Sequence, residues 1–478
     1  MASQKPVILW FRQDLRIADN PALNAAHACG APVLPIFVQD DVNAGDWAPG
    51  GASRWWLHQS LSALNSEMGG HLQFFRGDPN DIVPGIAAET DADIVFWNRC
   101  YEPWQRARDE KLRDSLRASG KSARTFNASL LFEPPEISKA DRTPYRVFTP
   151  FYKKGCLENG PRPREAEQAP DDVRWHQHSG NTTLDDLGLE PKVRWYDEMQ
   201  NTWTPGERGA RERLATFLKN GLKGYKEGRN FPDRKNVSRL SPHLHFGEIS
   251  PQQVWRALDE QQRSDFPVED IEHFRSELAW REFSYNLLYH FPDLPSENLQ
   301  RKFNRFPWRE DAAALRAWQR GETGYPIVDA GMRELWRTGY MHNRVRMIVG
   351  SFLVKNLLLH WHHGERWFWD TLVDADLANN SASWQWIAGC GADAAPYFRI
   401  FNPLTQGRKF DPDGAYVRRY VPELAAMPDK FLHAPWEASE EIRRAANVTL
   451  GQTYPDPIVD LAESRERALA AFRSLSSG

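Results

Sequence analysis

Cysteine is scarce in this sequence, with four residues in 478. Cys29, Cys100, Cys156 and Cys390 are far apart and lack the close spacing of metal ligands, which argues against a disulfide framework, zinc or an iron–sulfur cluster. Long apolar runs are also missing, since no stretch approaches the ~20 residues that span a bilayer. The N-terminus has no signal-peptide pattern. We therefore expect a cytoplasmic protein that binds neither a metal nor a membrane.

Excess charge of one sign is almost absent as well. The chain has 60 Lys and Arg against 64 Asp and Glu, so contact with nucleic acid would need a local basic patch. Residues 219–239 carry seven Lys or Arg and two acidic residues, and residues 301–346 carry ten and five. One such run is usually a solvated helix surface. Two of them in one aromatic-rich region favour a phosphate-binding face.

Three parts of the chain differ in pattern. Over residues 1–131, β-rich apolar runs such as VILWF and DIVFW alternate with helical stretches, which predicts an α/β domain with a parallel, Rossmann-like sheet. The glycine fingerprint of dinucleotide-binding folds is missing after the first run. Residues 132–203 are rich in proline and acidic residues and predict a long surface connector. Residues 204–478 have helical periodicity and predict an all-α domain.

Tryptophan is abundant, with 20 residues, and polar side chains accompany several of them. Glu277, Trp280 and Arg281 are spaced to share one helix face. That face could stack on a base or a flavin and hold a phosphate, although a buried ion pair beside a core tryptophan would have the same pattern. Arg344 and Arg346 point to different faces of a helix, so one can meet phosphate while the other requires a buried carboxylate.

The segment DADLANNSASWQW combines acids, amides and tryptophans. Each of these polar groups would cost ~1–3 kcal/mol if it were buried without a partner. A polar aromatic ligand would satisfy them, and we therefore expect the helical part to bind one.

These segments resemble the photolyase/cryptochrome family. The resemblance runs from WFRQDLRIADNPAL through SRLSPHLHFGEIS, SELAWREF and TGYPIVDAGMRELWRTGYMHNRVRM to DADLANNSASWQWIAGCGADAAPYFRIFNPLTQGRKFDPDGAYVRRYVPEL. It implies an antenna-binding α/β domain, a connector and a helical domain that binds FAD, which is reduced and anionic in the active form. Within the family, the chain is most similar to the cyclobutane pyrimidine dimer photolyases of the plant-cryptochrome-like branch.

The resemblance also implies a set of FAD-binding residues. Residues 225 and 237–241 match the cradle of the phosphates and ribityl chain, although the family often has threonine at Val237. The pair Arg346 and Asp374 matches an ion pair beside the isoalloxazine, and Asn380 matches the side chain that faces flavin N5. An amide there favours repair, whereas an aspartate would favour a protonated flavin and light sensing. The implied set is Tyr225, Val237, Ser238, Arg239, Leu240, Ser241, Arg281, Arg346, Asp374, Ala375, Asp376 and Asn380.

Residues for the lesion, for DNA and for electron transfer follow from the same resemblance. The implied catalytic set is Glu277, Trp280, Asn343, Met347 and Asn380. The implied DNA contacts are Arg229, Glu277, Trp280, Asn343, Arg344 and Gln406. Trp308, Trp361 and Trp384 match an electron-transfer triad, although core packing is the alternative for each one alone. His243 and His245 keep a (6-4) photolyase open as an alternative, because those enzymes use a histidine near this segment.

The implied function is light-driven repair of cyclobutane pyrimidine dimers. Excited reduced FAD gives an electron to a flipped-out dimer, the cyclobutane bonds break and the electron returns. Damaged DNA is the expected partner, and we expect a monomer. The alternative is a cryptochrome photoreceptor, which usually carries a long C-terminal extension that is not seen here. Glu102 resembles a position that contacts an antenna chromophore, and this favours methenyltetrahydrofolate.

Overall fold

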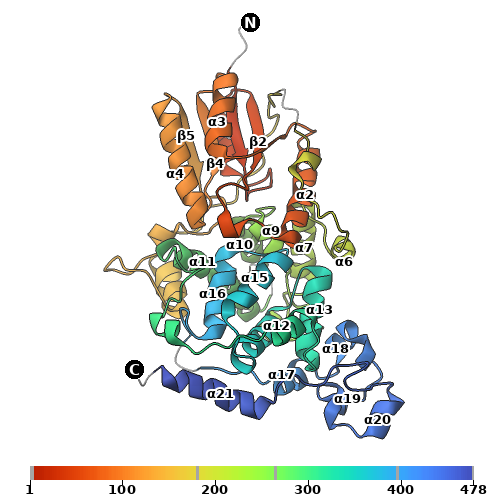
Figure 1. Ribbon diagram of the computed structural model, residues 1–478. Coiled ribbons are helices and arrows are strands. Elements are labelled where there is room, and N and C mark those ends of the chain that lie inside the picture. The colour runs from red at the N-terminus through yellow and green to blue at the C-terminus, as the bar shows by residue number, and fades with distance from the viewer. Residues whose placement is uncertain (1–4, 179–181, 263–265, 395–397, 476–478) are drawn as a thin grey trace. The chain divides into compact units, whose positions relative to one another are not determined.

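The computed structural model describes residues 5–178, 182–262, 266–394 and 398–475 (Figure 1). Contacts divide the chain into two compact units. Unit 1 is Met1–Lys223, Ser238–Pro292 and Asp376–Ala378, and unit 2 is Gly224–Val237, Asp293–Ala375 and Asn379–Gly478. The chain therefore passes from one unit to the other several times. The predicted division at residues 131 and 203 follows composition and stays a prediction.

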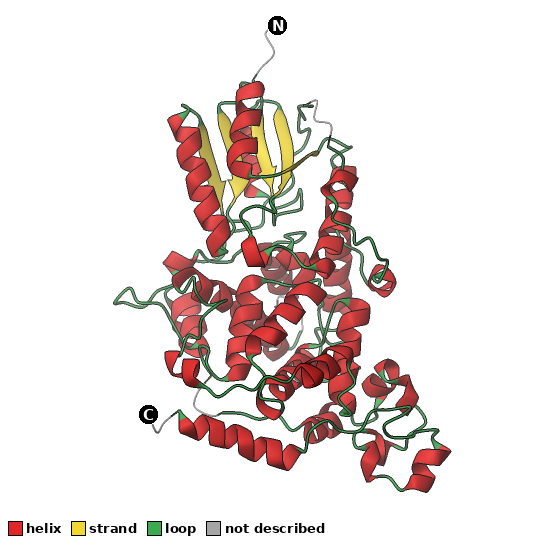
Figure 2. Ribbon diagram, viewed as in Figure 1, coloured by secondary structure: helices red, strands yellow, loops and turns green. Residues whose placement is uncertain are grey.

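Unit 1 contains a parallel five-stranded sheet with the order β3-β2-β1-β4-β5. Its strands are β1 (Val7–Phe11), β2 (Val33–Gln39), β3 (Gln73–Arg76), β4 (Ile94–Asn98) and β5 (Ser122–Phe126). The central strand β1 is buried throughout because helices cover both faces of the sheet. This order confirms the predicted Rossmann-like α/β architecture. Figure 2 shows that the arrows of the sheet lie together within unit 1.

The helices around the sheet are its crossover connections. They are α1 (Pro21–Ala28), α2 (Gly51–Glu67), α3 (Pro79–Glu89) and α4 (Pro103–Ala118), with a short 3-10 turn η1 (Gly45–Trp47) before α2. Right-handed crossovers place α1 and α2 on one face and α3 and α4 on the other. Figure 1 shows α3 and α4 in front of the strands. Beneath them Trp10 and Trp97 pack edge to face, with ring centroids 6.0 Å apart.

The remainder of unit 1 is helical or irregular. Its elements are η2 (Pro134–Glu136), α5 (Phe148–Pro150), η3 (Phe151–Glu158), η4 (Asp185–Leu187), α6 (Asp197–Thr202), α7 (Glu207–Asn220), α9 (Ser241–His245), α10 (Pro251–Gln262) and α11 (Val268–His290). Gly247 lies against Gln13 and Asp14, in the segment that follows β1. It has φ +68°, and a Cβ atom there would lie 2.1 Å from the Gln13 carbonyl oxygen, so only glycine fits. Arg16 donates to the Gly247 carbonyl over 2.8 Å.

The described part of unit 2 is built from helices, which confirms the predicted helical architecture of the C-terminal region. They are α8 (Tyr225–Gly228), η5 (Arg301–Arg305), α12 (Ala312–Arg320), α13 (Pro326–Thr338), α14 (Asn343–Ser351), η6 (Phe352–Asn356), α15 (Trp361–Thr371), α16 (Leu377–Ala388, which begins in unit 1), α17 (Pro403–Phe410), α18 (Ala415–Tyr420), η7 (Pro422–Leu424), α19 (Asp429–Leu432), η8 (Pro435–Glu437), α20 (Glu440–Ala445) and α21 (Leu461–Ser474). Trp318, Phe352 and Trp361 are fully buried in its core.

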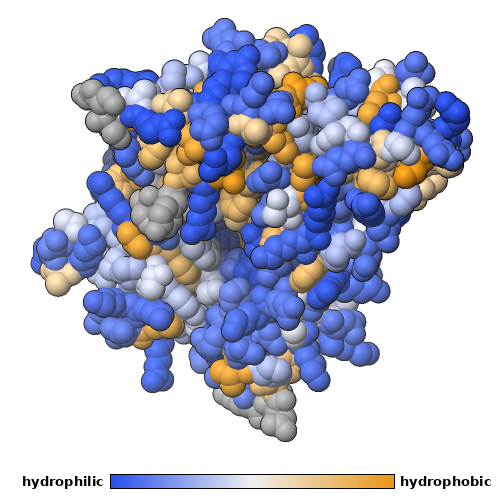
Figure 3. All heavy atoms as spheres, turned by 90° about the horizontal axis from the view of Figure 1, so that it is seen from below, coloured by the Kyte–Doolittle hydropathy of each residue, from blue (hydrophilic) through white to orange (hydrophobic). Residues whose placement is uncertain are grey.

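Figure 3 shows one face, on which hydrophobic side chains form small groups among hydrophilic ones. In the ranges that the structure describes, no helix combines the length and the apolar character needed to cross a membrane.

Candidate functional site

In unit 1, Asp376 is the centre of a buried polar cluster. It is 4% exposed, accepts a hydrogen bond from the Tyr285 hydroxyl, and its Oδ2 lies 3.2 Å from Nδ1 of His245. Burial raises the pKa of Asp376, but the hydrogen bond and charge of His245 and the charge of Arg281 outweigh burial and leave that pKa below its usual range. Asp376 is therefore a buried carboxylate that stays ionised at neutral pH.

Arg281 and Glu102 belong to the same cluster. The Arg281 guanidinium lies over the Tyr285 ring, 4.8 Å from its centroid, and donates to the Ser129 carbonyl over 2.7 Å. Glu102 accepts a hydrogen bond from Nε1 of Trp104 over 2.6 Å. Burial raises the pKa of Glu102 to about 7, with opposing electrostatic effects from His245 and Asp376. The structure thus places Glu102 in a buried polar network, and its antenna role stays a prediction.

The expected phosphate cradle has an unusual backbone. Arg239 has φ +53°, in the left-handed region, and Leu240 follows in the right-handed helical region with φ −86°. This alternation turns successive N–H groups to one side and forms an anion-binding concavity. The Leu240 N–H also lies 3.4 Å from Oγ of Ser238. The segment therefore fits the pyrophosphate of a dinucleotide cofactor. Tyr225 and Val237, which belong to the same predicted set, fall in unit 2, where Tyr225 is buried.

The helix α11 carries the predicted lesion-binding residues Glu277 and Trp280. The Trp280 ring stacks on Phe148, with centroids 3.8 Å apart and an angle of 8° between the planes. Phe283 packs edge to face against Trp280 at 5.8 Å. These contacts fix the plane of the indole, and Glu277 is half-buried three residues earlier. The structure therefore presents Trp280 as a supported stacking surface.

In unit 2, Arg346 and Asp374 form the expected ion pair. One guanidinium nitrogen of Arg346 lies 3.1 and 2.9 Å from the two carboxylate oxygens of Asp374, and Nε donates to the Met341 carbonyl over 2.7 Å. Burial lowers the pKa of Arg346, and the charge of Asp374 outweighs burial and raises it above the usual value. Ala375, the next residue in the predicted flavin set, is buried.

Glu365 is a site residue that sequence reasoning missed. Its backbone carbonyl accepts a hydrogen bond from Nδ2 of Asn380 over 3.0 Å, and its Oε1 accepts one from the Ser381 hydroxyl over 2.6 Å. Burial raises the pKa of Glu365 to about 8. The available signal was helical spacing, because Glu365 lies four residues after Trp361 and three before Phe368, on the buried face of α15.

Basic and aromatic side chains gather around Arg344 in unit 2. Arg344 donates to Asn230, lies over the Phe410 ring at 4.5 Å, and contacts Sδ of Met347 at 3.6 Å. Burial and the nearby charge of Arg229 lower the pKa of Arg344. Two neighbouring guanidinium groups form a site for an anion such as phosphate. We call this group the Arg344 cluster.

Two further predicted DNA contacts lie on helices of the Arg344 cluster. Gln406 is one turn before Phe410 on α17, and its Oε1 is buried without a hydrogen-bond partner in the described part of the chain. Asn343 is exposed at the first turn of α14, four residues before Met347. The structure thus brings Arg229, Arg344 and Met347 close together and places Gln406 and Asn343 on adjoining helical turns.

The three tryptophans of the expected triad lie in unit 2. Trp361 and Trp384 are buried, and Trp308 is half-buried. Trp384 packs edge to face on Phe368 at 5.0 Å. It also lies directly over Gly364 of α15, where a Cβ atom would approach the indole to 2.0 Å. An electron path through the three rings stays a prediction.

His243 and His245 both occupy buried polar networks of unit 1. His243 bonds to Glu248 and packs edge to face on Trp56 at 5.1 Å. His245 is the partner of Asp376 described above. These contacts account for both histidines without a lesion.

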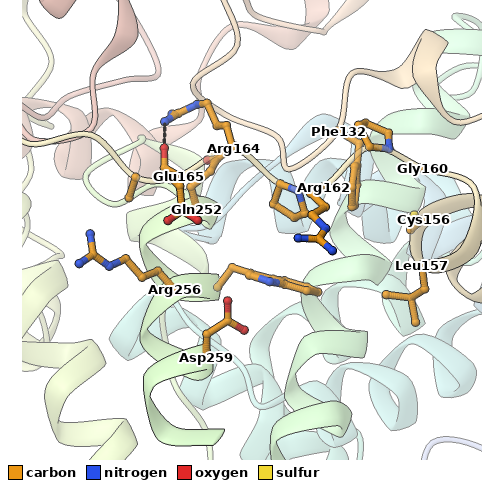
Figure 4. Close-up of a pocket in the computed structure, with 14 residues that line it drawn as sticks. Phe132, Cys156, Leu157, Gly160, Arg162, Arg164, Glu165, Gln252, Arg256 and Asp259 are labelled. Carbon is orange, nitrogen blue, oxygen red and sulfur yellow. Dashed lines mark hydrogen bonds between the residues drawn. The ribbon is translucent and has the colours of Figure 1, made fainter. Parts of the chain in front are cut away.

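A separate pocket of unit 1 has a volume of about 340 Å³. It lies between the connector and α10, and Figure 4 shows Arg164 bonded to the Glu165 backbone at its edge. Its lining includes Trp255, Gln252, Arg162 and Arg256. The lining contains no predicted site residue, so the pocket is distinct from the candidate site.

Comparisons with known proteins match both halves of the chain. A family model described as DNA photolyase matches residues 7–182, and one described as the FAD-binding domain of DNA photolyase matches residues 274–474. The chain is 49% identical to a deoxyribodipyrimidine photo-lyase of Agrobacterium fabrum over 98% of both chains. It is 38% identical to cryptochrome-1 of Arabidopsis thaliana, over 98% of this chain and 70% of that protein.

Solved structures of photolyases and cryptochromes are also similar to this chain over nearly all of its length. A bacterial class III photolyase from Agrobacterium tumefaciens superposes with a TM-score of 0.95 at 48% identity, over 100% of this chain and 99% of that chain. A cryptochrome of Synechocystis sp. PCC6803 superposes with a TM-score of 0.90 at 29% identity, over 98% and 100%.

Proposed function

The chain belongs to the DNA photolyase family, and from this premise we propose that it repairs cyclobutane pyrimidine dimers in DNA with light. The reaction breaks the two carbon–carbon bonds that join neighbouring pyrimidines. The electron that starts the cleavage returns at the end, so the reaction has no net oxidation or reduction. The bound FAD, in its reduced form, supplies the light-excited electron donor.

Several of the groups described above would suit parts of FAD. The backbone concavity at Arg239 and Leu240 fits the pyrophosphate. The ion pair of Arg346 with Asp374 and the ionised Asp376 are the charged groups for the isoalloxazine. These polar groups are buried or half-buried, and a polar aromatic ligand would satisfy them better than packed side chains.

The observation that carries the proposal is the neutral amide of Asn380, held by the Glu365 carbonyl. Family resemblance alone leaves a photoreceptor possible, because cryptochromes share the fold. An amide at this position can hydrogen-bond the flavin but has no charge with which to hold a proton on it. The family resemblance associates this residue with repair.

Lesion and DNA binding follow from two other groups. Glu277 would hydrogen-bond the pyrimidine edge, and Trp280, braced by Phe148, would stack on the flipped-out dimer, because photolyases belong to the base-flipping enzymes. The Arg344 cluster would bind the DNA backbone. Such phosphate contacts weaken as salt rises and have little sequence preference.

Repair by the purified FAD-containing protein tests the proposal. The protein is mixed with an oligonucleotide that contains one thymine dimer and is illuminated with blue light, and the dimer is quantified by chromatography. We expect loss of the dimer in light and none in the dark. A reduced flavin with intact dimers would refute repair and favour a photoreceptor. Repair of a (6-4) lesion instead would establish the alternative enzyme.

We also propose a second, light-harvesting chromophore of the methenyltetrahydrofolate class. The support is the resemblance at Glu102. A related photolyase from Sulfolobus tokodaii, with a TM-score of 0.83 at 29% identity over 98% of this chain, contains two FAD molecules. Mass spectrometry of the chromophores released from the purified protein separates a folate from a second flavin. Release of FAD alone would contradict the proposal.

We further propose that the protein acts as a monomer in the cytoplasm, with damaged DNA as its partner. Light scattering of the purified protein during gel filtration tests the first point, since a monomer has a mass of 55.1 kDa. A mass twice that value would contradict it.

A further inference from the structure

His360 lies between two tryptophans of unit 2. Its ring centroid is 5.1 Å from that of Trp308, in an edge-to-face arrangement, and 5.7 Å from that of Trp361, at an angle of 26°. The imidazole is therefore in contact range of both indoles and forms the aromatic link between them.

The backbone explains why these rings meet. Arg309 and Leu359 form an isolated parallel bridge, and the Arg309 N–H donates to the Leu358 carbonyl over 2.8 Å. Leu358 has φ +54°, a conformation that leucine rarely adopts, and it turns the chain just before α15 begins. The bridge thus sets Trp308 and His360 next to each other from two segments about 50 residues apart in the sequence.

The imidazole of His360 is uncharged at neutral pH. It is the N-cap of α15, and Nδ1 accepts a hydrogen bond from the His362 N–H over 3.2 Å, which requires an unprotonated Nδ1. Burial, together with the charges of His363 and Arg366 on the same helix, lowers the pKa of His360 to about 4. The acidic Glu310 acts on the neighbouring His363.

The two indoles differ in their polar contacts. Nε1 of Trp361 donates to Oδ1 of Asn298 over 3.0 Å. Nε1 of Trp308 is buried without a hydrogen-bond acceptor in the described ranges. If Trp308 loses an electron, its ring carries a positive charge for as long as Nε1 keeps its proton. The energy of that state therefore depends directly on the charges around it.

We propose that His360 is a positioning residue for electron transfer, which holds an uncharged ring between Trp308 and Trp361 so that positive charge can pass outward to Trp308. This inference rests on the proposed function. Oxidised FAD, if bound and excited by light, would supply the oxidant for Trp384, and Trp361 would then reduce the oxidised Trp384. In the step at issue, one electron passes from Trp308 to oxidised Trp361. No bond forms or breaks in that step.

A charge series at residue 360 tests the proposal in the full-length protein with FAD. His360→Asn and His360→Asp keep an N-cap acceptor and bring zero and negative charge, whereas His360→Lys brings a positive charge. The control Ala445→Lys adds the same charge on the exposed surface of α20. Transient absorption after a laser pulse measures how fast, and in what yield, the positive charge reaches Trp308.

We expect His360→Lys to slow the step or lower its yield by about tenfold or more, because a like charge ~5 Å away opposes oxidation of Trp308. His360→Asn should stay within about twofold of the wild type, His360→Asp should match or exceed it, and Ala445→Lys should change it little. Equal values for all variants, or an equal loss for Asp and Lys, would overturn the proposal.

Two further measurements test the charge of His360 directly and separate its role from the proposed function. NMR of ¹³C-labelled histidine follows the protonation of His360 directly, and titration near pH 6.5 instead of pH 4 would also overturn the proposal. Repair by wild-type protein whose FAD has been reduced chemically does not use the tryptophans. Its failure would therefore refute the proposed function, whereas its success with a flat charge series would refute only the role of His360.

Discussion

Two buried carboxyl groups, one in each unit, have opposite protonation. Asp376 in unit 1 has a pKa below its usual range, although burial raises it, because His245 and Tyr285 donate to it and Arg281 is near. Glu365 in unit 2 is 1% exposed, and burial raises its pKa to about 8, because the single hydroxyl of Ser381 that donates to its side chain does not offset burial. Both groups are buried and each has an arginine that lowers its pKa, so they differ in the number of donors and in the charge of His245 beside Asp376.

This difference shows what a buried acid needs to stay ionised. Burial disfavours the charged form in both cases, and at Asp376 two donors together with the charges of His245 and Arg281 reverse that effect. The ionised Asp376 can offer a fixed negative charge to a ligand. Glu365 is protonated at neutral pH and holds Asn380 through its backbone, so it adds no negative charge beside that amide.

The largest expected effect is the loss of Asp376. Asp376→Ala leaves Tyr285, His245 and Arg281 buried without their shared partner, and removing one member of such a group costs ~3–5 kcal/mol. We expect the free energy of unfolding to fall by that amount and FAD to be lost during purification. Urea unfolding and the flavin absorbance check both. The exposed Asp46→Ala in the same unit is the control, and similar behaviour of the two variants would contradict the central role of Asp376.

Glu365→Gln should give the next largest effect, visible as a change in pH dependence. Because the folded pKa of about 8 lies above that of the unfolded chain, the folded state binds the extra proton, and stability falls as pH rises from about 4.5 to about 8. The slope for one group is at most ~1.4 kcal/mol per pH unit. Glutamine mimics the protonated acid, so the variant should lose this slope.

Unfolding free energies at pH 5 and pH 8 measure that change. Glu102 and Glu282, whose pKa values burial also raises to about 7, contribute equally to both proteins, so the difference reports Glu365. Glu466→Gln on the exposed surface of α21 should keep the wild-type slope. Parallel curves for wild type and Glu365→Gln would show that Glu365 is ionised like Asp376.

The fold was predictable where its cause is local. The strand β1 is an unbroken apolar run because both faces of the sheet are covered, and helical spacing runs through the C-terminal half. The passage of residues 224–237 into unit 2 and of residues 238–292 into unit 1 was not predictable. Their placement depends on distant contacts such as that of Arg16 with Gly247.

Some residues of the candidate site were likewise predictable from the sequence, and others were not. The opposite roles of Arg344 and Arg346 follow from their spacing, and the ion pair with Asp374 was expected. Tyr285 and Glu365 were missed because their partners are 91 and 16 residues away and the residue types are ordinary for a helix. A buried acid on an apolar helix face was the only local signal.

A smaller effect, on DNA binding, is expected at Arg344, which differs from Arg346 in its charged neighbour. Arg346 is paired with a carboxylate, whereas Arg344 has Arg229 as its charged neighbour, so Arg344 is the one open to an external anion. We expect Arg344→Ala to weaken binding of dimer-containing DNA by about tenfold and to lower the slope of log affinity against log salt by about 1. Fluorescence anisotropy at several salt concentrations measures both values. Arg444→Ala, whose side chain pairs with Glu440, is the control, and an unchanged slope for Arg344→Ala would remove it from the DNA contacts.

The smallest effect on stability is expected when Asp376 loses one of its hydrogen-bond donors and so becomes more like Glu365. Tyr285→Phe removes one donor and keeps His245, which should cost about 1 kcal/mol.

Asp376 has a lowered folded pKa, so its contribution to stability is present above the unfolded pKa and is lost as pH falls through the folded one. Raising that folded pKa moves the acid loss of stability to higher pH. Acid unfolding followed by circular dichroism detects the shift, with Tyr289→Phe on the same helix as the control, because the Tyr289 ring and carbonyl that contact Arg106 are kept. Identical acid curves for Tyr285→Phe and the wild type would mean that His245 and Arg281 alone keep Asp376 ionised.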